Sequence, residues 1–246
     1  MKNTDWLRLL ITESISSDAT ARPRLLPRVG GGLKEVVNFI DLERLLAISG
    51  VSHMGLCVLR ESDGLRTPSS FPLIDPATRC YSPPRVLEQF MIKKGTVLFS
   101  RLQHRLPSVY ELLQSLAEVG QCVSQVVALL SPSHGQATVP HADDHPIITV
   151  QLYGAKKWEI WDRFSEALIA ESGSVQRLEQ LFYQAANGKP SSLVMEPGDV
   201  LCVPSRFIHT AVTGGSNSLS ISFQLTQHLR GHDRREDACR VLLTSH

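Results

Sequence analysis

The chain has 246 residues, of which 42% are hydrophobic and 20% are charged, and its net charge at pH 7 is +1. This apolar content supports a sizeable buried core and excludes wholesale disorder. The nearly balanced charge lacks the basic excess of a dedicated nucleic-acid or anionic-membrane binder, so we expect neither nucleic acid nor membrane as a partner.

Helices and short strands are mixed in residues 1–120, which we expect to form an N-terminal α+β wrap. Asp41 can cap a helix that follows it. The pattern Ser108-Val109-Tyr110-Glu111 matches a capping box and would open another helix. The predicted elements of this part are a helix over Trp6–Ile11, a helix over Leu42–Ile48, strands over Met54–Arg60 and Gly95–Ser100, and a helix ended by Gly120.

After residue 120 the chain consists mainly of short apolar runs separated by turn residues. Such a series predicts a mainly β sandwich or barrel over 121–225, followed by a tail over 226–246. Pro197-Gly198-Asp199 is typical of a tight turn. A helical insertion at one rim is predicted over 163–190. The predicted strands are Val123–Leu130, Ile147–Tyr153, Trp158–Trp161, Ser192–Met195, Val200–Val203 and Leu219–Leu225.

The five cysteines are scattered along the sequence, and no two of them form a Cys-x-x-Cys pair. This spacing disfavours a disulfide framework or a cysteine zinc site and indicates a reducing compartment. No signal peptide is readable at the N-terminus, and no apolar run approaches the roughly 20 residues that cross a bilayer. We therefore expect a single cytoplasmic domain over residues 1–246.

His141, Asp143 and His209 carry the clearest chemical signal. Alternate residues of a strand share a face, so His141 and Asp143 would aim an imidazole and a carboxylate at one spot. A second imidazole from a distant strand would complete a set that suits Fe(II), because it leaves coordination positions open. A His-x-Asp pair alone also fits an ordinary structural role. His145 offers another spacing with His141, and we expect it beside the ligands or facing the substrate.

Two longer motifs surround these residues. The first runs from residue 131 to 158 and contains Pro-His-Ala-Asp-Asp, an apolar strand and Gln-Leu-Tyr-Gly-Ala-Lys-Lys-Trp. The second is Glu-Pro-Gly-Asp-Val-Leu-Cys-Val-Pro over 196–204, followed by His209. In this order and spacing, the motifs resemble the Jumonji C oxygenases, and among them the cupin-type bacterial ribosomal oxygenases. The resemblance covers roughly residues 90–225.

The resemblance implies a double-stranded β-helix, the jelly-roll barrel of the cupins, in which His141, Asp143 and His209 bind Fe(II). It also implies that Lys156 binds the distal carboxylate of 2-oxoglutarate. An inward lysine is costly unless an anion pairs with it, which agrees with this role. Thr138 matches a hydroxyl donor to the same co-substrate, with a loop threonine of no special role as the alternative.

The chain departs from the family pattern at Val127 and Leu129, where relatives often carry asparagine and tyrosine. Neither apolar side chain can hydrogen-bond 2-oxoglutarate, so we expect that pocket to be repacked. The ribosomal oxygenases also continue into a helical dimerisation region and a winged-helix domain. This chain ends about 20 residues after its last predicted strand and is expected to lack both.

The implied activity is that of a dioxygenase that consumes O2 and 2-oxoglutarate and hydroxylates an amino-acid side chain in a protein or peptide. One alternative is a biosynthetic hydroxylase of a free amino acid or a peptide natural product. Another is a non-catalytic cupin module that binds metal. Because the relatives dimerise through helices, a homodimer that involves residues 229–246 is a further expectation.

Overall fold

The computed structural model describes residues 5–18, 20–47, 56–59, 77, 82–136, 140–164, 181, 184 and 188–226. The α-helices of its N-terminal half are α1 (Asp5–Ser16), α2 (Phe39–Ala47), α3 (Pro83–Leu87) and α4 (Pro107–Ser115). Shorter helical turns are η1 (Gly31–Glu35), η4 (Glu88–Ile92), η5 (Leu102–His104) and η6 (Ala117–Cys122). The strands are β1 (Arg24–Leu26), β2 (Leu56–Leu59), β3 (Thr96–Phe99), β4 (Val123–Ser131), β5 (Ile147–Tyr153), β6 (Lys156–Arg163), β7 (Ser191–Met195), β8 (Val200–Val203), β9 (Phe207–Thr213) and β10 (Ser218–Leu225).

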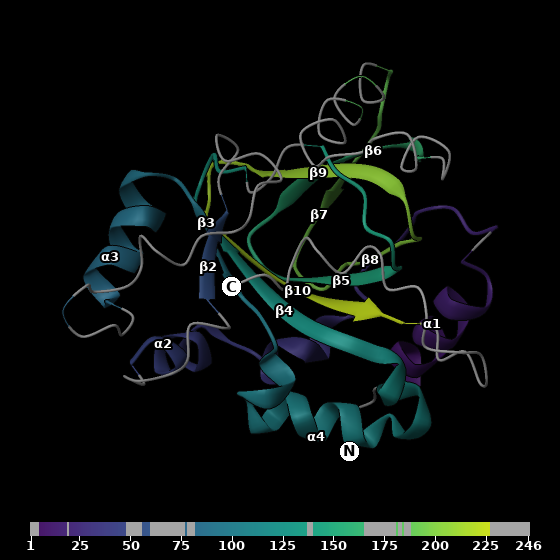
Figure 1. Cartoon of the computed structure of the whole chain (residues 1–246), viewed down its shortest axis with the longest axis horizontal. Coiled ribbons are helices and arrows are strands. Elements are labelled where there is room, and N and C mark those ends of the chain that lie inside the picture. Colours follow the sequence, from purple (N-terminus) through teal and green to yellow (C-terminus); the bar gives the residue numbers. More distant parts are fainter. Residues whose placement is uncertain are drawn as a thin grey trace.

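These strands form two antiparallel sheets that face each other (Figure 1). The large sheet has seven strands in the order β1-β8-β5-β10-β4-β3-β2, and the small sheet has three in the order β7-β6-β9. Apolar side chains from both sheets meet between them, which makes the space between the sheets a packed core. This core contains Ile147, Leu201 and Val203 from the large sheet and Trp158, Ile160, Met195 and Phe207 from the small sheet. The arrangement confirms the predicted mainly β jelly-roll barrel.

Strands β5, β8 and β10 of the large sheet are buried on both faces, and successive residues alternate between two environments. On β10, Leu219, Ile221 and Phe223 belong to an outer core, which also contains Leu7 and Ile11 of α1. Helix α4 adds Val109, Leu112 and Leu113 to the same core. Figure 1 shows α1 and α4 on the side of the large sheet that faces away from the small sheet. The helices therefore leave the inner face of the large sheet free to line the barrel.

The predicted strands before β6 agree closely with the structure. Strand β5 has the predicted bounds, and β2, β3 and β4 each lie within two residues of them. Strand β6 is longer than predicted because the polar residues Lys156 and Lys157 also pair with β7. Strands β1 and β9 were not predicted. The proposed division into wrap, barrel core and tail stays a prediction.

Two predicted helix starts are wrong. Helix α2 begins at Phe39 because Asn38 caps it, its Oδ1 accepting hydrogen bonds from the N–H groups of Ile40 and Asp41. Asp41 instead accepts a hydrogen bond from the Asn38 N–H through Oδ2, so the two residues form a reciprocal cap. Helix α4 begins at Pro107, and Ser108 donates its hydroxyl to the carbonyl of Val36 rather than capping the helix. Helix α4 also ends at residue 115, before the 3₁₀ turn that contains Gly120.

The predicted helical insertion over 163–190 lies largely outside the described residues. Its first residue, Arg163, belongs to β6, and 188–190 are not helical. The segment 229–246 also lies outside them. Among the described residues, none of the helices combines the length and apolar character that a membrane crossing requires.

Candidate metal centre

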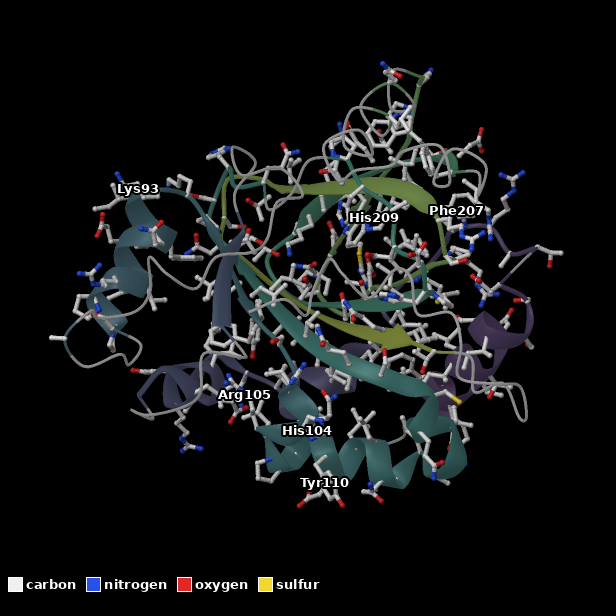
Figure 2. The ribbon with its side chains drawn as sticks, viewed as in Figure 1. Lys93, His104, Arg105, Tyr110, Phe207 and His209 are labelled. Atoms are coloured by element: carbon white, nitrogen blue, oxygen red, sulfur yellow. The ribbon has the colours of Figure 1, made fainter. Side chains whose placement is uncertain are left out.

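Strand β9 lies at the edge of the small sheet and carries His209 (Figure 2). On its free edge, β9 meets His141 in an isolated antiparallel bridge. The His141 N–H donates to the His209 carbonyl at 3.1 Å, and the His209 N–H donates to the His141 carbonyl at 2.7 Å. The bridge brings the two imidazole centroids within 4.4 Å of each other. Backbone pairing thus joins two histidines that lie far apart in the sequence.

Asp143 completes the cluster. One ligand atom from each of His141, Asp143 and His209 lies within 4.8 Å of the other two, and His209 Nε2 is 3.7 Å from Asp143 Oδ2. The predicted strand over His141-Ala142-Asp143 is wrong, since only His141 takes part in a bridge. The Asp143 backbone is held instead by the N–H of Arg206, which donates to the Asp143 carbonyl at 2.6 Å.

The surroundings of His209 keep its ring neutral and oriented. Its Nδ1 donates a hydrogen bond to the Phe207 carbonyl at 2.9 Å, which leaves the lone pair of Nε2 toward Asp143. Burial lowers the pKa of His209 to about 4. Trp158 stacks on the imidazole, with ring centroids 5.7 Å apart. A neutral imidazole with a fixed tautomer is the form that binds a metal ion.

The electrostatics of Asp143 also favour the form that a metal ion needs. Burial acts to raise the pKa of its carboxyl, but the neighbouring His209 and His141 outweigh burial, and the pKa lies below its ordinary value. The Asp143 side chain is 28% exposed, whereas that of His209 is 5% exposed, so the cluster opens to solvent beside Asp143. Two imidazoles and a carboxylate that converge from one side suit Fe(II) and leave positions for further ligands.

Lys156 lies inside the same barrel, at the start of β6, and is 5% exposed. Its Nζ donates to Ser220 Oγ of the large sheet at 2.9 Å. Within the described part of the chain, no carboxylate lies within ion-pair distance of Lys156, and burial lowers its pKa to about 7. Lys157 points to the opposite face, where it is half-exposed and pairs with Glu159 at 2.7 Å, as the alternation along a strand predicts.

A row of polar side chains on the large sheet was not predicted from the sequence. Ser218, Ser220 and Ser222 alternate with apolar residues along β10 and face the barrel interior. Ser222 shares a hydrogen bond with Thr149 at 2.7 Å, and Ser218 accepts one from Gln151 at 2.7 Å. The signal was the alternation Ser-Leu-Ser-Ile-Ser, which predicts a strand with one polar face.

This row lies beside the two apolar positions that depart from the family pattern. Strand β10 pairs with β4 so that Ser222 is opposite Val127 and Ser220 is opposite Leu129. Val127 is buried, with 3% of its surface exposed. Hydroxyl groups therefore lie next to the positions where the expected amide and phenol are missing.

The remaining candidate residues have varied positions. Thr138 lies outside the described residues, so its predicted role stays a prediction. His145 Nε2 is buried and has no hydrogen-bond partner within the described part. Asp144 is exposed at the rim, 4.0 Å from Arg206 Nε. His134 is exposed in its turn.

Two facing antiparallel sheets with an inward set of two histidines and one aspartate define a jelly-roll protein with a cupin-type metal site. Residues 99–231, more than half of the chain, match the family model described as JmjC domain. The chain therefore belongs to the JmjC domain family.

Curated relatives agree with this family. The chain is 26% identical over 207 residues to the bifunctional lysine-specific demethylase and histidyl-hydroxylase NO66 of Drosophila pseudoobscura pseudoobscura, covering 83% of this chain and 20% of that protein. It is 33% identical over 128 residues to the protein of the same name from Aedes aegypti, covering 51% of this chain and 19% of that protein. Ribosomal oxygenase 1 of Rattus norvegicus is 31% identical over 126 residues, covering 49% and 20%. The chain spans about a fifth of the length of these relatives.

Solved structures support the fold. The E. coli protein ycfD superposes with a TM-score of 0.57 at 16% identity, covering 87% of this chain and 51% of that chain. A structure of the same ribosomal oxygenase in complex with cobalt and 2-oxoglutarate gives a TM-score of 0.55 at 16% identity, covering 87% and 49%. Likeness at this identity establishes a shared barrel.

Proposed function

We propose that this protein is an Fe(II)- and 2-oxoglutarate-dependent dioxygenase that hydroxylates an amino-acid side chain. One observation carries the proposal: the cluster of His141, Asp143 and His209 shares a barrel with a buried lysine for which the described residues supply no anion. A barrel that holds both a metal ion and a buried cation would suit an anionic chelator that reaches from one to the other. Membership of the JmjC domain family supports the same assignment.

Each group in the barrel has a separate task in this proposal. His141, Asp143 and His209 would hold the metal ion from one side. Lys156 would bind the distal carboxylate of 2-oxoglutarate, because a buried ammonium without an anion is costly. Bound Fe(II), with O2 and 2-oxoglutarate, would supply the oxidising chemistry that converts a C–H group into C–OH and leaves succinate and CO2.

The serine row would replace the hydrogen bonds that Val127 and Leu129 cannot make. Ser220 already contacts Lys156, and its hydroxyl can donate to a carboxylate that arrives beside the ammonium. The apolar side chains of Trp158 and Leu201 belong to the same inner core. They would keep water from the co-substrate and strengthen its ion pair with Lys156.

The proposed substrate is a histidyl or other side chain in a protein or peptide. The names of the relatives, histidyl-hydroxylase and ribosomal oxygenase, support a protein substrate. The open side of the cluster, beside the 28% exposed Asp143, gives a bulky substrate access. A cytoplasmic location is part of the proposal and is supported by the described cysteines Cys122 and Cys202, which are free thiols.

The proposal is tested by incubating the protein with Fe(II), 2-oxoglutarate, air and peptide pools. The expected result is succinate release together with a peptide that gains the mass of one oxygen. His141→Ala should lose both signals, whereas His134→Ala, a change at an exposed turn histidine, should keep them. Succinate release coupled to an oxidised free amino acid would shift the substrate to the biosynthetic alternative. Metal binding without any turnover would favour the non-catalytic module.

A further inference from the structure

The turn that precedes β9 is anchored by a residue from the N-terminal part of the chain. Asp18 is buried and accepts two hydrogen bonds from Ser205, which lies 187 residues away. The Ser205 N–H donates to Asp18 Oδ1 at 2.7 Å, and the Ser205 hydroxyl donates to Asp18 Oδ2 at 2.6 Å. Both contacts are short, as expected when an ionised carboxylate is the acceptor.

The two residues after Ser205 contact the metal centre through their backbones. The N–H of Arg206 donates to the carbonyl of Asp143 at 2.6 Å, and the carbonyl of Phe207 accepts the Nδ1–H of His209 at 2.9 Å. Arg206 also has a φ of +66°, a backbone conformation that needs support from its surroundings. One turn therefore joins the Asp18 carboxylate to two of the three residues in the cluster.

The side chain of Arg163 contacts both Asp18 and Phe207 at this turn. Arg163 Nη2 donates to the Asp18 carbonyl at 2.5 Å, and its guanidinium lies over the Phe207 ring at 5.0 Å from the centroid. Arg22 approaches this ring at 5.9 Å. Figure 2 shows Phe207 and His209 on strand β9. The contacts on Asp18 and Phe207 thus fix where β9 begins.

We propose that Asp18 is a positioning residue for the metal centre: by clamping Ser205, it holds Arg206 and Phe207 where they orient Asp143 and His209. This inference rests on the proposed function only in requiring that the cluster binds a metal ion. Removing a group that orients metal ligands through hydrogen bonds typically weakens metal affinity 10- to 100-fold. A purely structural anchor would change folding and leave the affinity of the folded protein unchanged.

The test is a titration of the metal-free protein with Co(II), followed by its visible absorption, beside a thermal unfolding curve for each variant. Co(II) is a suitable probe because a relative of the same fold was solved with cobalt. Asp18→Ala should weaken Co(II) binding about 10- to 100-fold and alter the absorption spectrum. Asp18→Asn keeps an oxygen for the Ser205 N–H and should restore binding to within about threefold.

Two further variants provide a surface control and a replacement in case Asp18→Ala does not fold. Asp162→Asn changes a carboxylate that is 95% exposed and pairs with Arg22 at the surface, and it should bind Co(II) like the wild type. If Asp18→Ala does not fold, Ser205→Ala removes only the hydroxyl contact and should weaken Co(II) binding roughly fivefold.

Wild-type affinity and spectrum in folded Asp18→Ala, or in Ser205→Ala where the first variant does not fold, would overturn the positioning role alone. Failure of the wild type itself to bind Co(II) would overturn the proposed function as well, so the two failures are distinct.

Discussion

Replacing Lys156 with methionine should make the metal-free protein more stable. The same change should abolish binding of 2-oxoglutarate. Burial lowers the pKa of Lys156 from its ordinary value of 10.5 to about 7. Since one pKa unit corresponds to about 1.4 kcal/mol, holding this lysine in the barrel costs the folded state roughly 4 kcal/mol at pH 7. Lys156→Met removes that cost and leaves the Ser220 hydroxyl without its donor, a loss of about 1 kcal/mol. The expected net gain is roughly 3 kcal/mol.

The stability gained by Lys156→Met should decrease as the pH rises. Lys156 stays protonated up to about pH 10.5 in the unfolded chain but only up to about pH 7 in the folded metal-free protein. The free-energy cost of burying this lysine is therefore complete below pH 7 and disappears toward pH 10.5. Urea unfolding at pH 7 and pH 10 measures this change. Lys157→Met is the matched control, because that neighbouring lysine is half-exposed, and it should change stability by less than about 0.5 kcal/mol. A destabilised Lys156→Met protein, or a gain that does not shrink at pH 10, would refute the reasoning.

Three further outcomes are expected. The Kd for 2-oxoglutarate, measured by calorimetry, should rise up to about tenfold per pH unit above pH 7, since the ligand selects the charged form of Lys156 whose pKa is lowered to about 7; a flat profile to pH 9 would contradict this role. Ser220→Ala should raise the same Kd roughly fivefold, the effect of one lost hydrogen bond, and an unchanged Kd would remove Ser220 from the site. Gly154→Ala should destabilise the fold by roughly 1–3 kcal/mol in urea, because Gly154 has a φ of +63° and an added Cβ would collide with the Asn217 carbonyl; full stability would contradict that conformation.

Local pattern was sufficient for most of the barrel strands. Strand β5 was predicted with its observed bounds because Ile147–Tyr153 is a buried, largely apolar run between turn residues. Strand β9 was not, because the polar residues His209 and Thr210 interrupt its apolar pattern. The alternating serines indicate a polar face on β10. The sequence does not indicate that Lys156 of the other sheet contacts this face.

The sequence named the three residues of the candidate metal cluster but did not indicate how the fold joins them. The motifs named His141, Asp143 and His209, and the structure brings all three together. The expected strand geometry of the His-x-Asp segment is replaced by one bridge to β9 and one backbone contact from Arg206. The clamp from Asp18 joins residues too far apart in the sequence for any local pattern to indicate.

Metal and 2-oxoglutarate should bind at one site in the barrel. Anaerobic titration of the protein with Fe(II) and 2-oxoglutarate, followed by visible absorption, tests it most directly. A weak charge-transfer band should form only when both are present, and Asp143→Ala should not form it. Binding of Fe(II) and 2-oxoglutarate by the wild type without this band would show that the two occupy separate sites and would contradict the claim.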